Sequence, residues 1–174
     1  LRKYPHVLIM SDEIYEHFVY GEAKHVSFVK AAPDLKERTL VLNGASKGYA
    51  MTGWRLGFGA GPRFLIAAVA KLLSQTTTCP SSISQAAAVA AFGGDQAPIT
   101  HMREIYIERR QRMLGLLKNV KGVSCTPPDG AFYVFANVSG LMGLKTPSGK
   151  TIETDTDLVS FVLEDEGVAT VGGA

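Results

Sequence analysis

Two short runs of consecutive apolar positions predict strands that are buried on both faces of a sheet. They are Val7–Met10 and Thr39–Leu42, and polar residues follow each run. Continuous apolar runs of this length are typical of parallel sheets, because helices cover both faces of such sheets. A third stretch, Arg55–Ala60, is rich in glycine and closes at Gly61-Pro62, so we predict a third strand there.

Apolar positions at intervals of three and four residues then predict helices. We expect one helix with Pro62 in its first turn, a second over Ile83–Phe92 and a long amphipathic one over Pro98–Val120. The polar segment Thr76–Ser82 is expected to connect the first two. Gly122 is expected to end the long helix.

Beyond the long helix the pattern changes to short strands and loops. Val123–Cys125 and Ala131–Phe135 predict two strands on either side of a Pro-Pro-Asp-Gly turn. Asp155 or Thr156 is expected to cap a final helix that ends at Gly167. We therefore predict an α/β segment over residues 1–110 and an α+β segment over residues 111–174, divided inside the long helix.

Composition excludes several classes of function. The net charge is only +2 and the basic residues are scattered, so no nucleic-acid surface is indicated. No apolar run is long enough for a membrane span. The two cysteines and four histidines lack metal-ligand spacing, so no metal site is predicted. Two isolated thiols and the absence of an export signal favour the cytoplasm. Predicted strands lie almost at both ends of the chain, so we expect an internal segment of a longer protein.

Polar residues follow the first two predicted strands directly. Asp12 comes after the first, and Ser46-Lys47 comes after the second and a tight turn. In open α/β sheets, ligands collect beyond the carboxyl ends of the strands, so these side chains are candidates for a site. Taken singly, a lysine after a strand is usually a solvated surface residue, and an aspartate is usually a turn residue or a helix cap.

The joint pattern is more specific. The stretch Asn43–Gly57, N-G-A-S-K-G-Y-A-M-T-G-W-R-L-G, closely resembles the cofactor-lysine signature of fold-type I pyridoxal-phosphate enzymes, in the form of the bacterial aspartate aminotransferase branch. An Asp-x-x-Tyr motif, Asp12 to Tyr15, lies 35 residues upstream of Lys47, as it does in that family. The segment Pro128–Tyr133 resembles a motif of the family's small domain.

This resemblance implies a role for five side chains. Lys47 would hold pyridoxal 5′-phosphate as a Schiff base and then act as the general base. Asp12 would pair with the pyridine nitrogen, Tyr15 would bind the 3′-oxygen, and Arg55 would pair with the phosphate. Ser46 would add a hydroxyl group nearby.

The resemblance also implies the fold and the activity. Residues 1–110 would be the C-terminal half of the three-layer, PLP-binding large domain, and residues 111–174 a partial small domain. The parent protein would be a cytoplasmic homodimer that transfers an amino group between an amino acid, with aspartate as the expected donor, and a 2-oxo acid. The isolated chain is expected to be inactive, because the family's phosphate loop, ring-stacking aromatic and carboxylate-binding arginine are not found in it.

Two alternatives stay open at this point. Other fold-type I enzymes, such as β-lyases and synthases, share the residues expected to bind the cofactor. A non-catalytic fragment that only binds a partner chain is the other possibility.

Overall fold

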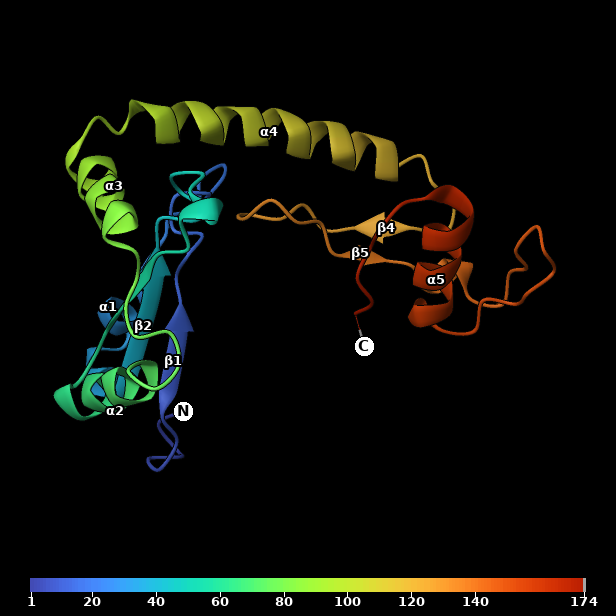
Figure 1. Cartoon of the computed structure of the whole chain (residues 1–174). Helices are drawn as coiled ribbons and strands as arrows, with labels where there is room; N and C mark the ends of the chain where they lie inside the picture. The colour runs from blue at the N-terminus through green and yellow to red at the C-terminus, as the bar shows by residue number, and fades with distance from the viewer. Residues whose placement is uncertain (174) are drawn as a thin grey trace. The chain divides into compact units, whose positions relative to one another are not determined.

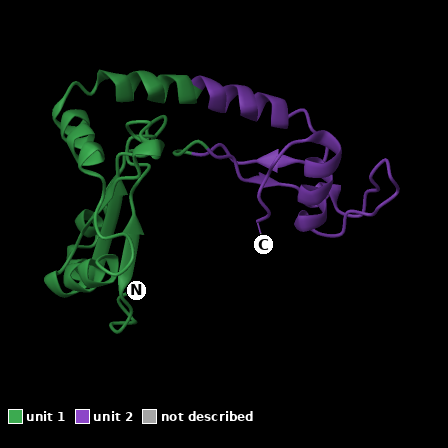
Figure 2. Cartoon of the chain, viewed as in Figure 1, with its two compact units in different colours: residues 1–107, 129–132 green, residues 108–128, 133–174 purple. Residues whose placement is uncertain are grey.

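The computed structural model of the chain describes residues 1–173 (Figure 1). Two compact units make up the chain: unit 1 holds residues 1–107 and 129–132, and unit 2 holds residues 108–128 and those from 133 onward (Figure 2). Helix α4 (Ala97–Leu117) contributes residues to both units. The predicted division after residue 110 falls in the same helix, and as a domain boundary of the parent protein it stays a prediction.

Unit 1 contains a three-stranded sheet in the order β1-β2-β3. Strands β1 and β2 are parallel, with Ile9 opposite Thr39, and their arrowheads point to the same end in Figure 1. Strand β3 is antiparallel to β2. The three predicted strands are thus present, although β1 starts two residues later than its apolar run and includes the polar pair after it. The strands are β1 (Ile9–Asp12), β2 (Thr39–Gly44) and β3 (Gly57–Ala60).

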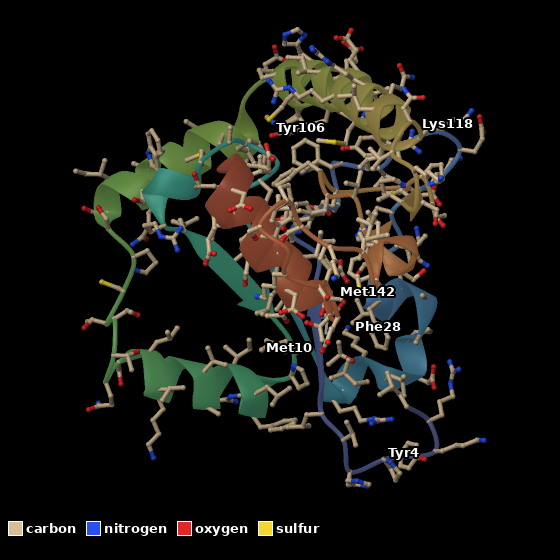
Figure 3. The ribbon with its side chains drawn as sticks, turned by 90° about the vertical axis from the view of Figure 1, so that its right-hand side faces the viewer. Tyr4, Met10, Phe28, Tyr106, Lys118 and Met142 are labelled. Atoms are coloured by element: carbon tan, nitrogen blue, oxygen red, sulfur yellow. The ribbon has the colours of Figure 1, made fainter. Side chains whose placement is uncertain are left out.

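The prediction that these strands are buried on both faces is wrong for this chain. Ile9 is buried at 8% exposure, but Met10, labelled in Figure 3, is 70% exposed. Ile9 packs with Ala32 and Leu35 in the hydrophobic core of unit 1, and Phe28 packs against this cluster. Side chains alternate between the faces of a strand, so this packing covers only one face of β1.

The helices of unit 1 begin and end close to the predicted residues. Pro62 is the N-cap of α2 and not a residue of its first turn. Helix α4 ends at Leu117 rather than Val120, and its predicted apolar stripe is partly exposed, with Leu116 at 59%. The helical segments are α1 (Phe28–Ala31), η1 (Pro33–Arg38), η2 (Thr52–Trp54), α2 (Arg63–Leu73), α3 (Ser82–Gly93) and α4.

Unit 2 contains an antiparallel pair of two-residue strands, a 3₁₀ turn and a helix. The strand predicted over Ala131–Phe135 is wrong, because the pairing partner of β4 lies further along the chain. Helix α5 is capped by Thr154, not by Asp155 or Thr156, in a reciprocal capping box with Asp157. The elements are β4 (Ser124–Cys125), β5 (Ala136–Asn137), η3 (Ser139–Leu141) and α5 (Asp155–Glu166).

None of the helices in the described part of the chain combines the length and the apolar character needed to cross a bilayer.

Candidate active site

The direction of the three strands brings the five predicted site residues to one edge of the sheet. Asp12 ends β1 opposite Leu42, and Lys47 lies in the turn that follows the parallel strand β2. The antiparallel strand β3 starts at this edge, so Arg55, two residues before it, lies there as well. Tyr15 follows in the turn after β1. The carboxyl ends of the two parallel strands thus meet where the sequence predicted a site.

Local hydrogen bonds fix the chain as it leaves β1. The backbone N–H of Glu13 donates to the carbonyl of Leu42 at 2.9 Å, which continues the pairing of β1 and β2 by one residue. The N–H of Ile14 donates to Oδ1 of Asp12 at 3.1 Å. One carboxylate oxygen of Asp12 therefore accepts a hydrogen bond within this turn, and the Asp12 side chain is exposed to solvent.

Lys47 points its amine at two aromatic faces. Its Nζ lies 5.8 Å from the ring centroid of Tyr15 and 5.3 Å from that of Phe132. Both distances are within the range of cation–π attraction. The turn that carries Lys47 is closed by a bond from the N–H of Ala50 to the Lys47 carbonyl at 3.2 Å. The amine consequently lies over both rings, which contact each other edge-on, beside the edge of the sheet.

Phe132 was not predicted as a site residue. It belongs to unit 1 because residues 129–131 pair with residues 18–20: the N–H of Tyr20 donates to Asp129, and that of Ala131 donates to Phe18, both at 2.9 Å. The signal in the sequence was the motif Pro128–Tyr133, which the resemblance assigned to the small domain. The structure places residues 129–132 of it in unit 1, beside the predicted cofactor lysine, and its place in the parent's small domain stays a prediction.

The ring of Phe132 lies in an aromatic cluster. It stacks on Tyr106 of α4, labelled in Figure 3, with centroids 5.2 Å apart and 20° between the planes. It meets Tyr15 edge-on at 5.2 Å and Phe18 at 6.1 Å. Phe18 is 1% exposed, so the cluster has a buried base. Aromatic pairs of this geometry stabilise one another, and they restrict where the Phe132 face can lie.

Arg55 and Ser46 lie near Lys47 in the chain, on either side of the turn and of η2. Nη1 of Arg55 donates to the carbonyl of Thr52 at 2.9 Å, and the side chain is exposed. The Arg55 backbone is left-handed, with φ of 51°, as it leaves η2 toward β3. Ser46 lies half-buried in the Lys47 turn. Both are at the predicted edge, and their roles toward a phosphate stay predictions.

The packing of β2 against β3 explains the small size of Gly44. A Cβ at this position would lie 2.9 Å from Cα of Gly57 and 2.9 Å from the carbonyl oxygen of Leu56. Both contacts are with backbone, which cannot move aside as a flexible side chain can. The close approach of the two strands therefore requires glycine here.

Gly44→Ser is expected to lower the free energy of unfolding by about 1–3 kcal/mol, because it overpacks the contact between β2 and β3. Gly53→Ala is the matched control, since a Cβ at Gly53 meets no atom within 4 Å. Urea unfolding midpoints compare the two variants. Equal stability of both would contradict this reading of the contact.

A cavity in unit 1 is separate from this group of residues. Among residues 1–173, no group of three or more His, Cys, Asp or Glu side chains could hold a metal ion. A cavity of about 520 Å³ in unit 1 includes neither Lys47 nor Asp12 in its lining. Its lining includes the ionisable side chains of Glu16, His17, Lys24, His25 and Arg103.

The residues at the sheet edge have the chemistry that pyridoxal 5′-phosphate requires. A primary amine is the group that condenses with its aldehyde, and a carboxylate can pair with its ring nitrogen. A phenol and a guanidinium are suited to its 3′-oxygen and its phosphate. Lys47, Asp12, Tyr15 and Arg55 supply one of each, so the donor set fits the cofactor.

Comparison with known proteins identifies the family. The family described as Aminotransferase class I and II matches residues 1–174, and the chain belongs to it. Aspartate aminotransferase of Rhizobium meliloti (strain 1021) is 48% identical over 174 residues, which is 100% of this chain and 42% of that protein. A probable aspartate/prephenate aminotransferase of Rickettsia felis is 45% identical over 173 residues, 99% of this chain and 42% of that protein.

Solved structures agree with this assignment. The aspartate aminotransferase structure from Rhizobium meliloti matches with a TM-score of 0.90 and 48% identity over 97% of this chain and 42% of that one. An aromatic aminotransferase from Pyrococcus horikoshii matches with a TM-score of 0.83 and 35% identity over 97% and 42% of the two chains. The predicted family and its α/β fold, present here in part, are confirmed. Enzymes of this family use pyridoxal 5′-phosphate, and this chain spans about 42% of the length of these relatives.

Proposed function

We propose that the parent protein of this chain catalyses pyridoxal-phosphate-dependent transfer of an amino group between an amino acid and a 2-oxo acid. The observation that carries the proposal is the Lys47 amine, which lies over the rings of Tyr15 and Phe132 at the sheet edge where Asp12 and Arg55 also lie. Relatives at 48% and 45% identity that are named aspartate or probable aspartate/prephenate aminotransferases support it.

Each side chain has a distinct task in this proposal. Lys47 anchors the cofactor and then moves the proton that leaves the substrate Cα. Asp12 holds the ring nitrogen in its protonated form, while Tyr15 donates to the 3′-oxygen. Arg55 and Ser46 bind the phosphate. When bound, the cofactor supplies an electron sink for the charge that develops at Cα.

The proposal extends to the substrate and the assembly. The names of the relatives favour aspartate as the amino donor, and a 2-oxo acid is then the acceptor. We propose that the parent protein is a cytoplasmic homodimer and that the isolated 174-residue chain is inactive. The chain covers only about 42% of the length of its relatives, so other parts of the parent protein complete the site.

A half-reaction tests this function directly. The parent protein is loaded with pyridoxal 5′-phosphate and mixed with aspartate, with no 2-oxo acid present. Transamination is expected to convert the cofactor to its amine form, with a matching loss of visible absorbance and one equivalent of oxaloacetate. A lyase would instead release ammonia over many turnovers. A protein that binds no cofactor would support the non-catalytic alternative.

A further inference from the structure

Glu13 is a buried carboxylate that the proposed chemistry does not use. Glu13 follows Asp12 directly in the sequence and is only 8% exposed. Both of its carboxylate oxygens have hydrogen-bonding partners, and these partners belong to unit 1. Oε1 accepts from the N–H of Phe28 at 2.8 Å, from Oγ of Ser27 at 3.0 Å and from Oγ of Ser11 at 3.2 Å, and Oε2 lies 3.3 Å from Nε2 of His25.

These contacts attach the segment 25–28 to the end of β1. Ser27 is the N-cap of α1, but its side chain does not cap that helix. The Glu13 carboxylate accepts the first helical N–H in its place. Further along, Ala32 and Leu35 pack on Ile9, near the start of β1. The α1–η1 segment is therefore fastened to β1 at both ends of the strand, through polar contacts at one end and apolar contacts at the other.

The ionised form of Glu13 is the one that this environment stabilises. Burial is the largest single influence and raises the pKa of Glu13, but the hydrogen bonds from Phe28, Ser27, His25 and Ser11 together lower it below the ordinary value of 4.5. The stabilising contribution of Glu13 is thus fully present above pH 4.5, and it is lost as the pH falls through the lower pKa of the folded state. At neutral pH the contacts link a buried anion to three donors and an imidazole.

We propose that Glu13 is a positioning residue, which fixes the backbone that carries Asp12 and Tyr15 by fastening residues 25–28 to the end of β1. The backbone N–H of Glu13 donates to the carbonyl of Leu42 in β2, and its carboxylate accepts from Phe28 in α1. Glu13 thus connects the end of β1 to both β2 and α1. Loss of the carboxylate leaves Phe28 and Ser27 without this acceptor and loosens the turn that begins at Asp12. The catalytic part of this inference rests on the proposed function.

The test uses the parent protein and three variants. Glu13→Ala removes all four contacts, while Glu13→Gln keeps an oxygen with the same reach. Glu22→Ala is the matched control, an exposed glutamate in the same loop region. Amide hydrogen exchange of Glu13 (or its substitute), Ile14 and Phe28 is measured without cofactor, and the pH midpoint of the cofactor absorbance is measured with it.

We expect Glu13→Ala to accelerate exchange at all three amides by about tenfold or more, because hydrogen bonds to charged groups are stronger than neutral ones. We also expect it to move the absorbance midpoint, since Asp12 and Tyr15 contact the cofactor. Glu13→Gln restores part of both effects, and Glu22→Ala matches the wild type. If Glu13→Ala does not fold, Glu13→Asp, which is one methylene too short to reach Phe28, takes its place with the same expectation.

Faster exchange at Phe28 alone, with residues 13 and 14 and the absorbance midpoint unchanged, would overturn the proposal, because Glu13 would then hold only the loop. Failure of the proposed function looks different. In that case the wild-type protein binds no pyridoxal 5′-phosphate or does not convert it with aspartate, while the exchange experiment still decides whether Glu13 fixes the backbone at Asp12.

Discussion

Lys47→Ala in the parent protein is expected to abolish covalent capture of pyridoxal 5′-phosphate by borohydride. It is also expected to lower kcat by at least roughly 10²–10⁴-fold, the usual contribution of a positioned general acid or base. The physical reason is that alanine has no amine to bond the aldehyde or to carry the proton from Cα. Absorbance before and after reduction, followed by mass measurement, reads out the capture, and initial rates give kcat.

Lys71→Ala is the control for this experiment. Lys71 is an exposed lysine in the last turn of α2, away from the sheet edge. Its removal is expected to change neither the captured mass nor the rate. Cofactor that remains covalently bound after reduction in the Lys47 variant would show that another lysine is the anchor, and the assignment of Lys47 would be wrong.

Asp12→Asn is expected to lower kcat/KM by about 10–100-fold. A hydrogen bond to a charged group contributes about 1.5–3 kcal/mol, and each 1.36 kcal/mol corresponds to about a tenfold change in rate. Asparagine has nearly the same shape, and its amide oxygen can still accept from the N–H of Ile14. The substitution therefore removes the charge expected to hold the ring nitrogen protonated, while it preserves the turn.

Glu16→Gln is the matched control, because Glu16 is a neighbouring carboxylate that accepts from Nδ2 of Asn43 at 2.7 Å. It is expected to leave kcat/KM within about threefold of the wild type, because glutamine keeps an oxygen that can accept from Asn43 and Glu16 is not expected to contact the cofactor. Equal losses in both variants would indicate a general electrostatic effect of the edge. A wild-type rate in the Asp12 variant would remove Asp12 from the proposed mechanism.

Phe132 is the residue at the site that the sequence did not predict. Asp12 and Tyr15 belong to one short motif and Lys47 and Arg55 to a second one further along the chain, so the sequence indicated all four. Phe132 lies 85 residues beyond Lys47 in the chain. Backbone bonds from residues 129–131 to residues 18–20 bring it there, and no local pattern encodes such a long-range pairing.

The burial of Glu13 could not be predicted from the sequence either. In the sequence it is one of several acidic residues between Ser11 and Glu16, and nothing distinguishes it from its neighbours. Only the packing of α1 against β1 shows that its carboxylate is buried and that it accepts from the start of that helix. Burial of a charge depends on which segments surround it, and this is a property of the fold.

By itself the sequence determined the family, the three strands, most of the helices and the order of the expected site residues. These depend on local spacing, since strand and helix periodicities and short motifs are written in neighbouring positions. The tertiary structure decided which strands run parallel, which edge gathers Asp12, Lys47 and Arg55, and which aromatic ring meets the amine. It also corrected the expected burial of β1, because an apolar pattern shows that a side chain can be covered but not which residues cover it.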